Sequence, residues 1–257
     1  MTPARLAPAR AGRPPSVPVV LTSVPEGLSD EVDWSAWYLT EEEDMGQRPE
    51  QGDIIRLFMS ILDELLRVSG RSGDFYVGGD AFFAWNADEP LVRVSPDVYL
   101  LREPVPRPLP HSWQTWLSGH RPPEVAFEIV SDDWKKDYEL GPAKYALLGV
   151  GELVIFDPGV VQGTATGEER FAVQLYRRTE DGLFVRRYAG DGPVHSRVLE
   201  CHVVAVQTPG GPRLRLAADP EGRELHPSVA EAREAAERRA EALQRELERL
   251  RGKEKPQ

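Results

Sequence analysis

Val125-Ala-Phe-Glu-Ile-Val130 is an apolar run of strand length that contains a single carboxylate, Glu128. A second run, Val94-Ser-Pro-Asp-Val-Tyr-Leu-Leu101, holds Asp97 where its apolar residues begin. A lone ionised carboxylate inside a buried strand is costly, so it needs a cation, a metal ion or a proton. If the two strands are neighbours, Asp97 and Glu128 meet and offer the hard oxygen ligands that Mg²⁺ prefers. The alternative from this local pattern is structural, with Glu128 paired to an arginine such as Arg93.

The residues around these two runs predict a mixed α/β fold. Apolar residues at helical spacing predict a core-facing helix that ends near Gly70: Ile54, Ile55, Leu57, Phe58, Ile61, Leu62, Leu65 and Leu66. Short strands are expected over residues 75–77, 81–85, 97–101 and 125–131, and a hairpin over 171–178 and 183–188. A helix over 142–148 separates strand 125–131 from strand 153–156, which is the pattern of a crossover unit. We therefore expect a mixed sheet with helices on its faces.

Composition limits the class of protein. The chain has 257 residues, of which 40% are hydrophobic and 28% charged, as in ordinary globular proteins. Its single cysteine, Cys201, excludes an intrachain disulfide framework and fits a reducing compartment, so a cytoplasmic location is expected. No apolar run approaches the length of a membrane helix, and no membrane partner is expected. The net charge of −11 argues against broad attraction to duplex nucleic acid, whose affinity comes from neutralised phosphates.

Three regions are expected along the chain. Residues 1–30 are rich in Pro, Ala and Arg and predict a disordered N-terminal tail. Residues 31–222 would form the α/β domain, and residues 223–257 a helical C-terminal tail. Ser228 and Glu231 form a capping box at the start of that helix. Its apolar stripe strengthens toward Leu243, Leu247 and Leu250, which predicts either a coiled-coil-like seam for a homo-oligomer or a solvated helix.

Several short motifs, in order, resemble a known family. They are Ser95-Pro-Asp-Val98, His111-Ser-Trp-Gln-Thr-Trp-Leu-Ser-Gly119, Pro123-Glu-Val-Ala-Phe-Glu-Ile-Val-Ser131, Trp134-Lys-Lys-Asp137, Lys144-Tyr145 and Leu148-Gly-Val-Gly-Glu-Leu-Val-Ile-Phe-Asp-Pro158. The sequence resembles the Uma-two family, a former domain of unknown function placed among PD-(D/E)xK restriction-endonuclease-like proteins. The resemblance runs from about Trp37 to Asp219. It implies a restriction-endonuclease-like mixed sheet flanked by helices, followed by a coiled-coil-like C-terminal helix.

The resemblance also implies a metal-dependent site for DNA hydrolysis. Asp97 and Glu128 would bind Mg²⁺ or Mn²⁺ directly, with the backbone carbonyl of Ile129 as a third ligand. Such a metal lowers the pKa of a bound water and stabilises charge on a phosphate oxygen. The family's lysine is expected four residues before the tyrosine, where this chain has Gly141. We therefore assign the catalytic lysine to Lys144, with Lys136 as the other candidate in the sequence.

Other assignments remain open in the sequence. A further acidic residue is expected from the first helix, and Glu50, Asp53 and Glu64 are all candidates. Asp137 and Lys144 would share one face of a continuous helix, being seven residues apart. Trp113 and Trp116 predict a short helix packed on the core, and Asp157 the end of a strand. The expected function is a metal-dependent endodeoxyribonuclease; the alternative is a catalytically impaired module of the same fold for binding or assembly.

Overall fold

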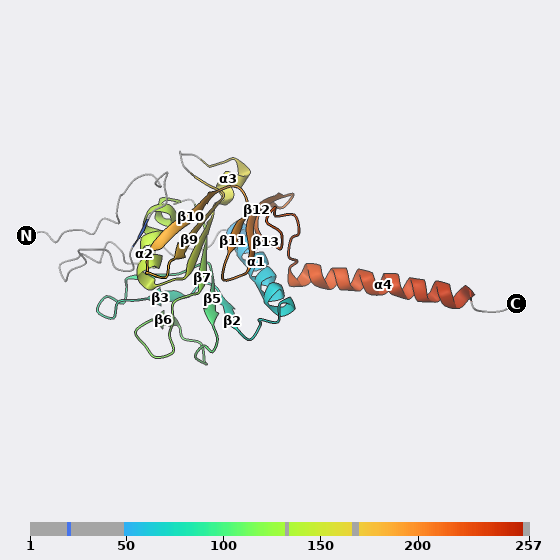
Figure 1. Ribbon diagram of the computed structural model, residues 1–257, viewed down its shortest axis with the longest axis horizontal. Coiled ribbons are helices and arrows are strands. Elements are labelled where there is room, and N and C mark those ends of the chain that lie inside the picture. Colours follow the sequence, from blue (N-terminus) through green and yellow to red (C-terminus); the bar gives the residue numbers. More distant parts are fainter. Residues whose placement is uncertain (1–19, 22–48, 132–133, 166–169, 254–257) are drawn as a thin grey trace, which may run out of the picture.

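The computed structural model describes residues 20–21, 49–131, 134–165 and 170–253 (Figure 1). The helices are α1 (Pro49–Val68), η2 (Lys136–Leu140), α2 (Gly141–Leu148), α3 (Pro158–Gln162) and α4 (Val229–Lys253). The strands are β1 (Val20–Leu21), β2 (Phe75–Gly78), β3 (Phe82–Ala84), β4 (Arg93–Val94), β5 (Val98–Arg102), β6 (Ser112–Gln114), β7 (Val125–Ile129), β8 (Glu152–Phe156), β9 (Val173–Arg178), β10 (Phe184–Gly190), β11 (Val194–Ser196), β12 (Cys201–Thr208) and β13 (Gly211–Ala217).

A seven-stranded mixed sheet in the order β1-β10-β9-β8-β7-β5-β2 forms the centre of the described chain. Within it β7 and β8 are parallel, and all the other neighbours are antiparallel. Two parallel neighbours need a crossover, which η2 and α2 supply. Pro142 lies in the first turn of α2, and Gly149 ends the helix with a φ of 96°. The predicted crossover unit and the mixed sheet with flanking helices are confirmed.

The two faces of this sheet carry different layers. Phe127 and its neighbours of the same parity on β7 point toward α1, where Phe58 packs edge-on against Phe127 at 4.7 Å between ring centroids. Ala126 and Val130 point the opposite way, into a cluster with Tyr145 of α2. Successive residues of β7 therefore alternate between the two faces of the sheet. Glu128 thus projects toward the α2 side.

A second sheet, β11-β12-β13, was not anticipated as a unit. It packs beside α1, and its apolar residues Val203, Leu214 and Leu216 join the cluster on that face of the central sheet. Buried Glu152 links the two sheets: Arg177 donates to it at 2.6 Å, and the hydroxyl of Ser196 donates at 2.6 Å. The sheet brings the β12–β13 turn toward α3 and the start of α1.

The structure differs from the sequence-based expectations in two places. Trp113 lies in strand β6, not in a helix, because β6 pairs in parallel with β3 and the indole stacks on Phe83. Trp116 follows as an exposed side chain. Val20 and Leu21 form β1 against β10, inside the segment expected to be disordered. The rest of that segment and residues 31–48 lie outside the described residues. Among the described helices, none is long and apolar enough to span a bilayer.

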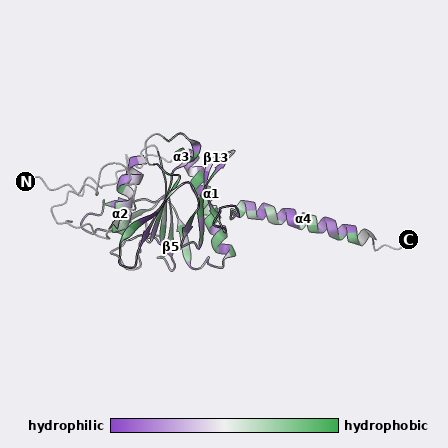
Figure 2. Ribbon diagram, turned by 45° about the horizontal axis from the view of Figure 1, so that its top comes forward, coloured by the Kyte–Doolittle hydropathy of each residue, from purple (hydrophilic) through white to green (hydrophobic). Residues whose placement is uncertain are grey.

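α4 extends away from the sheets and is attached by its first turn (Figures 1 and 2). The predicted capping box is present: Glu231 N–H donates to Ser228 Oγ at 3.3 Å, and Ser228 N–H donates to Glu231 Oε2 at 2.7 Å. Arg215 of β13 also binds Glu231 at 2.9 Å. Further along, Leu243, Leu247 and Leu250 stay 66%, 54% and 48% exposed. An exposed apolar stripe at this spacing is the pattern of a coiled-coil seam.

Truncation after Glu234 is expected to lower the solution mass by an integer factor while leaving the core folded. The docked first turn of α4 remains, and only the projecting part is removed. Multi-angle light scattering measures the mass, and circular dichroism measures the fold. Leu247→Glu should have the same effect, whereas Ala242→Glu, off the leucine stripe, should not. A wild-type monomer would show that the stripe serves another purpose.

Candidate functional site

Asp97 and Glu128 lie side by side because β5 and β7 are neighbours. Val98 pairs with Phe127 in the antiparallel register, which brings Asp97 opposite Glu128. The turn after β2 passes close by: a Cβ on Gly79 would lie 2.7 Å from the carbonyl oxygen of Asp97. Only glycine allows this approach.

Gln51, in the first turns of α1, is a central residue of the site that the sequence did not indicate. Its Nε2 donates to Asp97 Oδ1 at 3.2 Å and to the carbonyl oxygen of Ile129 at 3.2 Å. The backbone N–H of Ile129 in turn donates to Asp97 Oδ2 at 2.7 Å. One amide group therefore bridges two of the three groups expected to bind metal, Asp97 and the Ile129 carbonyl.

The environment of Asp97 disfavours its charged form. Burial raises the pKa of Asp97 to about 6, although the hydrogen bonds from Ile129 and Gln51 act in the opposite direction. The charge of Asp80, on the turn after β2, raises this pKa further. A carboxylate in such surroundings is stabilised when a cation is near it. Asp80 is a second residue of this neighbourhood that the sequence reasoning missed.

Glu128 is held from the opposite side by α2. The phenolic hydroxyl of buried Tyr145 donates a hydrogen bond to Glu128 Oε1. Burial and the charges of Glu128, Asp97 and Asp137 raise the pKa of Tyr145 well above its ordinary value, so the phenol keeps its proton. Tyr145 therefore fixes the orientation of Glu128. Arg93, the sequence-based alternative partner for Glu128, instead lies over the ring of Phe82, with 3.6 Å between its Cζ and the ring centroid.

Lys144 is buried in α2, directly before Tyr145. Successive residues of an α-helix differ by about 100° around its axis, so Lys144 leaves α2 in a different direction from Tyr145. Gly141 lies one turn before Tyr145 on the face toward Glu128. The helical backbone runs back past Asp137, but η2 (Lys136–Leu140) within it is a π-helical segment. The α-helical spacing assumed for Asp137 and Lys144 therefore does not apply.

The three acidic candidates of the first helix lie in different places. Asp53 is exposed and pairs with Arg56 at 2.5 Å. Glu64, buried near the far end of α1, pairs with Arg67 at 2.5 Å. Glu50 is exposed and lines a pocket together with Gln51 and Ile129. None of these carboxylates makes the contact to Asp97 that Gln51 makes.

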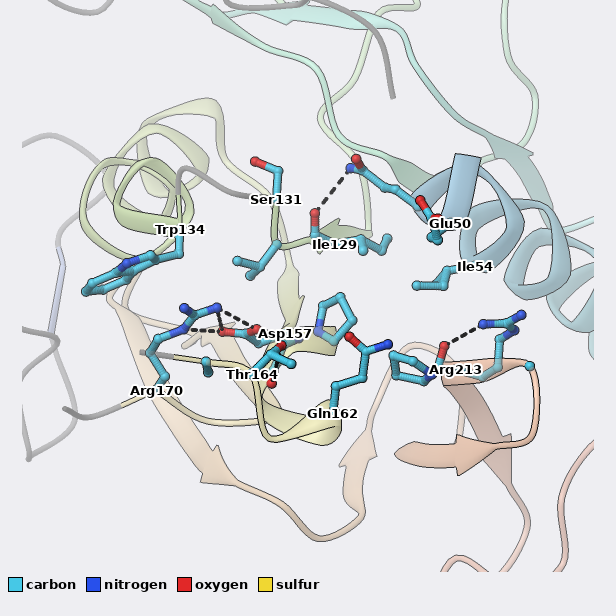
Figure 3. A pocket seen from close by; sticks show the side chains of 18 residues that line it. Glu50, Ile54, Ile129, Ser131, Trp134, Asp157, Gln162, Thr164, Arg170 and Arg213 are labelled. Carbon is cyan, nitrogen blue, oxygen red and sulfur yellow. Dashed lines mark hydrogen bonds and ion pairs between the residues drawn. The ribbon is translucent and has the colours of Figure 1, made fainter. Parts of the chain in front are cut away.

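A pocket of about 570 Å³ opens beside Gln51 and Ile129 (Figure 3). We call it the side pocket. It is lined by the first turns of α1, the end of β7, Trp134, α3 with its flanking residues, Arg170 and the β12–β13 turn: Glu50, Gln51, Ile54, Ile129, Val130, Ser131, Trp134, Asp157, Pro158, Gly159, Gln162, Thr164, Ala165, Arg170, Gly210, Gly211, Pro212 and Arg213. Gln51 and Ile129 belong both to this lining and to the carboxylate site, so the two are continuous.

A buried network around Asp157 fixes one wall of the side pocket. Asp157 follows β8, as expected for a strand end, and caps α3 by accepting from Gly159 N–H at 3.0 Å. Arg170 donates to both of its oxygens at 2.8 Å. The hydroxyl of Tyr138 in η2 adds a third contact at 2.9 Å, and burial first, then the charge of Asp157, raises the pKa of Tyr138. Asp157 thus has a structural role at the edge of the site.

The sequence profile of the Uma2 family, described as "Putative restriction endonuclease", matches residues 40–200. The matched span contains Asp97, Glu128, Lys144 and Tyr145. The chain belongs to the Uma2 family. The resemblance seen in the sequence motifs is thereby confirmed, as is the assignment to a restriction-endonuclease-like class.

The solved structures similar to this Uma2 protein include a "putative nuclease belonging to DUF820" from Anabaena variabilis. The two chains are 13% identical, with a TM-score of 0.40, and the match covers 60% of this chain and 75% of the other. The comparison with curated proteins gave no match.

Proposed function

We propose that this protein is a divalent-metal-dependent endonuclease that hydrolyses DNA phosphodiester bonds. Asp97, Glu128 and the carbonyl of Ile129 would hold Mg²⁺ or Mn²⁺, and Lys144 would act on the phosphate. The observation that carries the proposal is the meeting of Asp97 and Glu128 on adjacent strands, beside the carbonyl that Gln51 ties to Asp97. The family description supports the class of reaction.

The donor set fits a hard divalent cation. Two carboxylates and a carbonyl are oxygen ligands of the kind that Mg²⁺ takes, and Mg²⁺ keeps several waters besides its protein ligands. In the described part of the chain, no three His, Cys, Asp or Glu side chains gather as a metal site, so the set needs the Ile129 carbonyl. The amide N–H of Gln51 now satisfies that carbonyl and Asp97. If the side-chain amide of Gln51 were turned by 180°, its oxygen would face the space between Asp97 and the Ile129 carbonyl and could itself contact a cation there.

Each residue of the carboxylate site would have a distinct role in the proposed reaction. A bound divalent cation would supply Lewis acidity at the phosphate. Tyr145 holds Glu128 in position, and Gln51 positions Asp97 relative to the Ile129 carbonyl. Lys144 would place a positive charge where negative charge develops on the phosphate, which is most effective in a site that excludes water.

Cleavage of plasmid and of circular single-stranded DNA in the presence of Mn²⁺ tests this function. We expect wild-type protein to nick or linearise these substrates, and EDTA to stop it. Glu128→Gln should lower the rate by at least about 100-fold, because loss of a metal ligand removes several kcal/mol of transition-state stabilisation. The same variant, purified in parallel, reports contaminating nuclease. Equal rates for wild type and Glu128→Gln would refute the assignment.

A second candidate function is a catalytically impaired module of the same fold that binds or assembles. Two observations favour it: Gly141 occupies the position expected for the lysine, and an amide, Gln51, contacts Asp97 where the sequence led us to expect a carboxylate. The projecting α4 would then serve assembly. An intact metal response without cleavage of any DNA would support this candidate.

A further inference from the structure

The side pocket extends from the carboxylate site toward α3 and the β12–β13 turn. Its lining has equal numbers of acidic and basic side chains. It contains two acidic residues, Glu50 and Asp157, and two arginines, Arg170 and Arg213. Asp157 and Arg170 are bound to each other, with side chains only 1% and 10% exposed, so this pair offers little net charge to a ligand. A pocket with this lining is a poor clamp for a run of phosphates and suits a largely neutral group.

Trp134 gives the side pocket an aromatic surface held in place by the buried network. The indole is partly exposed at one edge of the pocket, and Arg170 lies over it with 5.4 Å between its Cζ and the ring centroid (Figure 3). Tyr138 packs against it edge-on at 5.5 Å and is itself anchored to Asp157. A fixed, partly exposed indole beside a guanidinium is a surface on which a nucleobase stacks.

The remaining lining supplies uncharged polar groups and one cation at the opposite side. Ser131 and Gln162 are exposed and can donate to and accept from the edges of a base. Arg213, across the pocket from Trp134, donates to the carbonyl of Pro212 at 2.8 Å, and no carboxylate in the described residues pairs with it (Figure 3). Its guanidinium is therefore available to a phosphate.

We propose that the side pocket takes up one unpaired nucleotide of the cleaved strand, with its base against Trp134 and its phosphate toward Arg213. The preferred substrate is then single-stranded or locally unpaired DNA. This rests on the proposed nuclease function. A pocket of about 570 Å³ has the size of a small-ligand site, and a duplex cannot enter it. The net charge of −11 also disfavours the electrostatic affinity on which non-specific duplex binding depends, whereas stacking supplies affinity that salt does not screen.

Binding of a fluorescent oligothymidine in EDTA, followed by anisotropy, tests the pocket separately from catalysis. We expect wild type to bind it at least tenfold more tightly than a blunt duplex of equal length. Trp134→Ala should weaken single-strand binding by about tenfold to a hundredfold, the range of one lost base stack, and Trp134→Phe should restore most of it. Trp116→Ala, at an exposed tryptophan on the loop after β6, is the matched control and should change nothing.

Arg213→Ala provides a second variant should Trp134→Ala fail to fold. It should weaken single-strand binding about tenfold and reduce its salt dependence by about one phosphate contact. Single-strand binding unchanged in both folded variants, or equal affinity for duplex and single strand, overturns the pocket proposal even if the protein cleaves DNA. Specific single-strand binding that depends on Trp134, without cleavage under any metal, upholds the pocket and refutes the nuclease.

Discussion

Asp97→Asn is expected to make the metal-free protein more stable near pH 7.5 while abolishing its stabilisation by Mg²⁺ or Mn²⁺. The carboxyl of Asp97 has its pKa raised to about 6 by burial and by Asp80, against about 3.9 in an unfolded chain. Ionisation of Asp97 above pH 6 therefore opposes folding. About two pKa units correspond to roughly 3 kcal/mol at most, and the acceptor lost in asparagine reduces the expected gain to about 1–2 kcal/mol.

The difference in stability between wild type and Asp97→Asn should depend on pH, in a direction set by the raised pKa of Asp97. Because the folded pKa of Asp97 lies above the unfolded one, its contribution to stability is fully present below about pH 4 and is lost as the pH rises to about 6. The variant should match wild type near pH 4.5 and exceed it increasingly up to pH 7. Melting temperatures in EDTA between pH 4.5 and 8 measure this. Parallel curves for the two proteins would contradict the assigned pKa.

The metal response of the same variants completes the test. At 100 times its Kd, a ligand stabilises the folded state by about 2.7 kcal/mol, which corresponds to roughly 5–10 °C for a chain of this size. Wild type should show this shift in millimolar Mn²⁺ and Asp97→Asn should not. Asp53→Asn is the matched control, because Asp53 is an exposed carboxylate at the same end of α1. An unresponsive wild type would remove the metal site.

The sequence predicted those parts of the site that depend on local pattern. Two apolar runs of strand length, each with one carboxylate, were enough to predict that Asp97 and Glu128 meet if the strands are neighbours, and β5 and β7 are neighbours. A carboxylate among apolar strand residues carries its own signal, because burial without a partner is costly. Both the helix over residues 54–66 and the crossover unit followed from the spacing of apolar residues and from the order of the predicted elements.

The missed parts depend on contacts between distant segments. Gln51 lies between the charged candidates Glu50 and Asp53, and nothing local distinguishes it. Its role depends on how α1 is rotated against the sheet. That rotation brings Gln51 to Ile129, which lies 78 residues later in the sequence. η2 was also unforeseen, because an i to i+5 turn leaves no hydrophobic period of its own. The wall of the side pocket required the return of Arg170 to Asp157, a pairing across a loop that composition does not specify.

Lys144→Met is expected to lower the cleavage rate by about 100-fold or more, with metal binding and fold nearly unchanged. Methionine preserves the packing of the buried stem in α2 and removes the ammonium together with the contact that it makes in the fold, so the melting temperature of the variant is measured beside its rate. A preorganised donor of this kind contributes about 10²–10³ in rate.

Gly141→Lys in the Lys144→Met background provides the matched rescue. Gly141 is the first residue of α2, one turn before Tyr145, and helical backbone does not itself require a glycine. Turnover of single- and double-stranded DNA with Mn²⁺ measures both effects, and Gly141→Lys alone should add little to an active wild type. A Lys144→Met variant as fast as its parent would show that the lysine assignment is wrong. If neither wild type nor Gly141→Lys cleaves any DNA, the binding module becomes the better description, because the carboxylate pair would then bind metal without a cation placed to act on the phosphate.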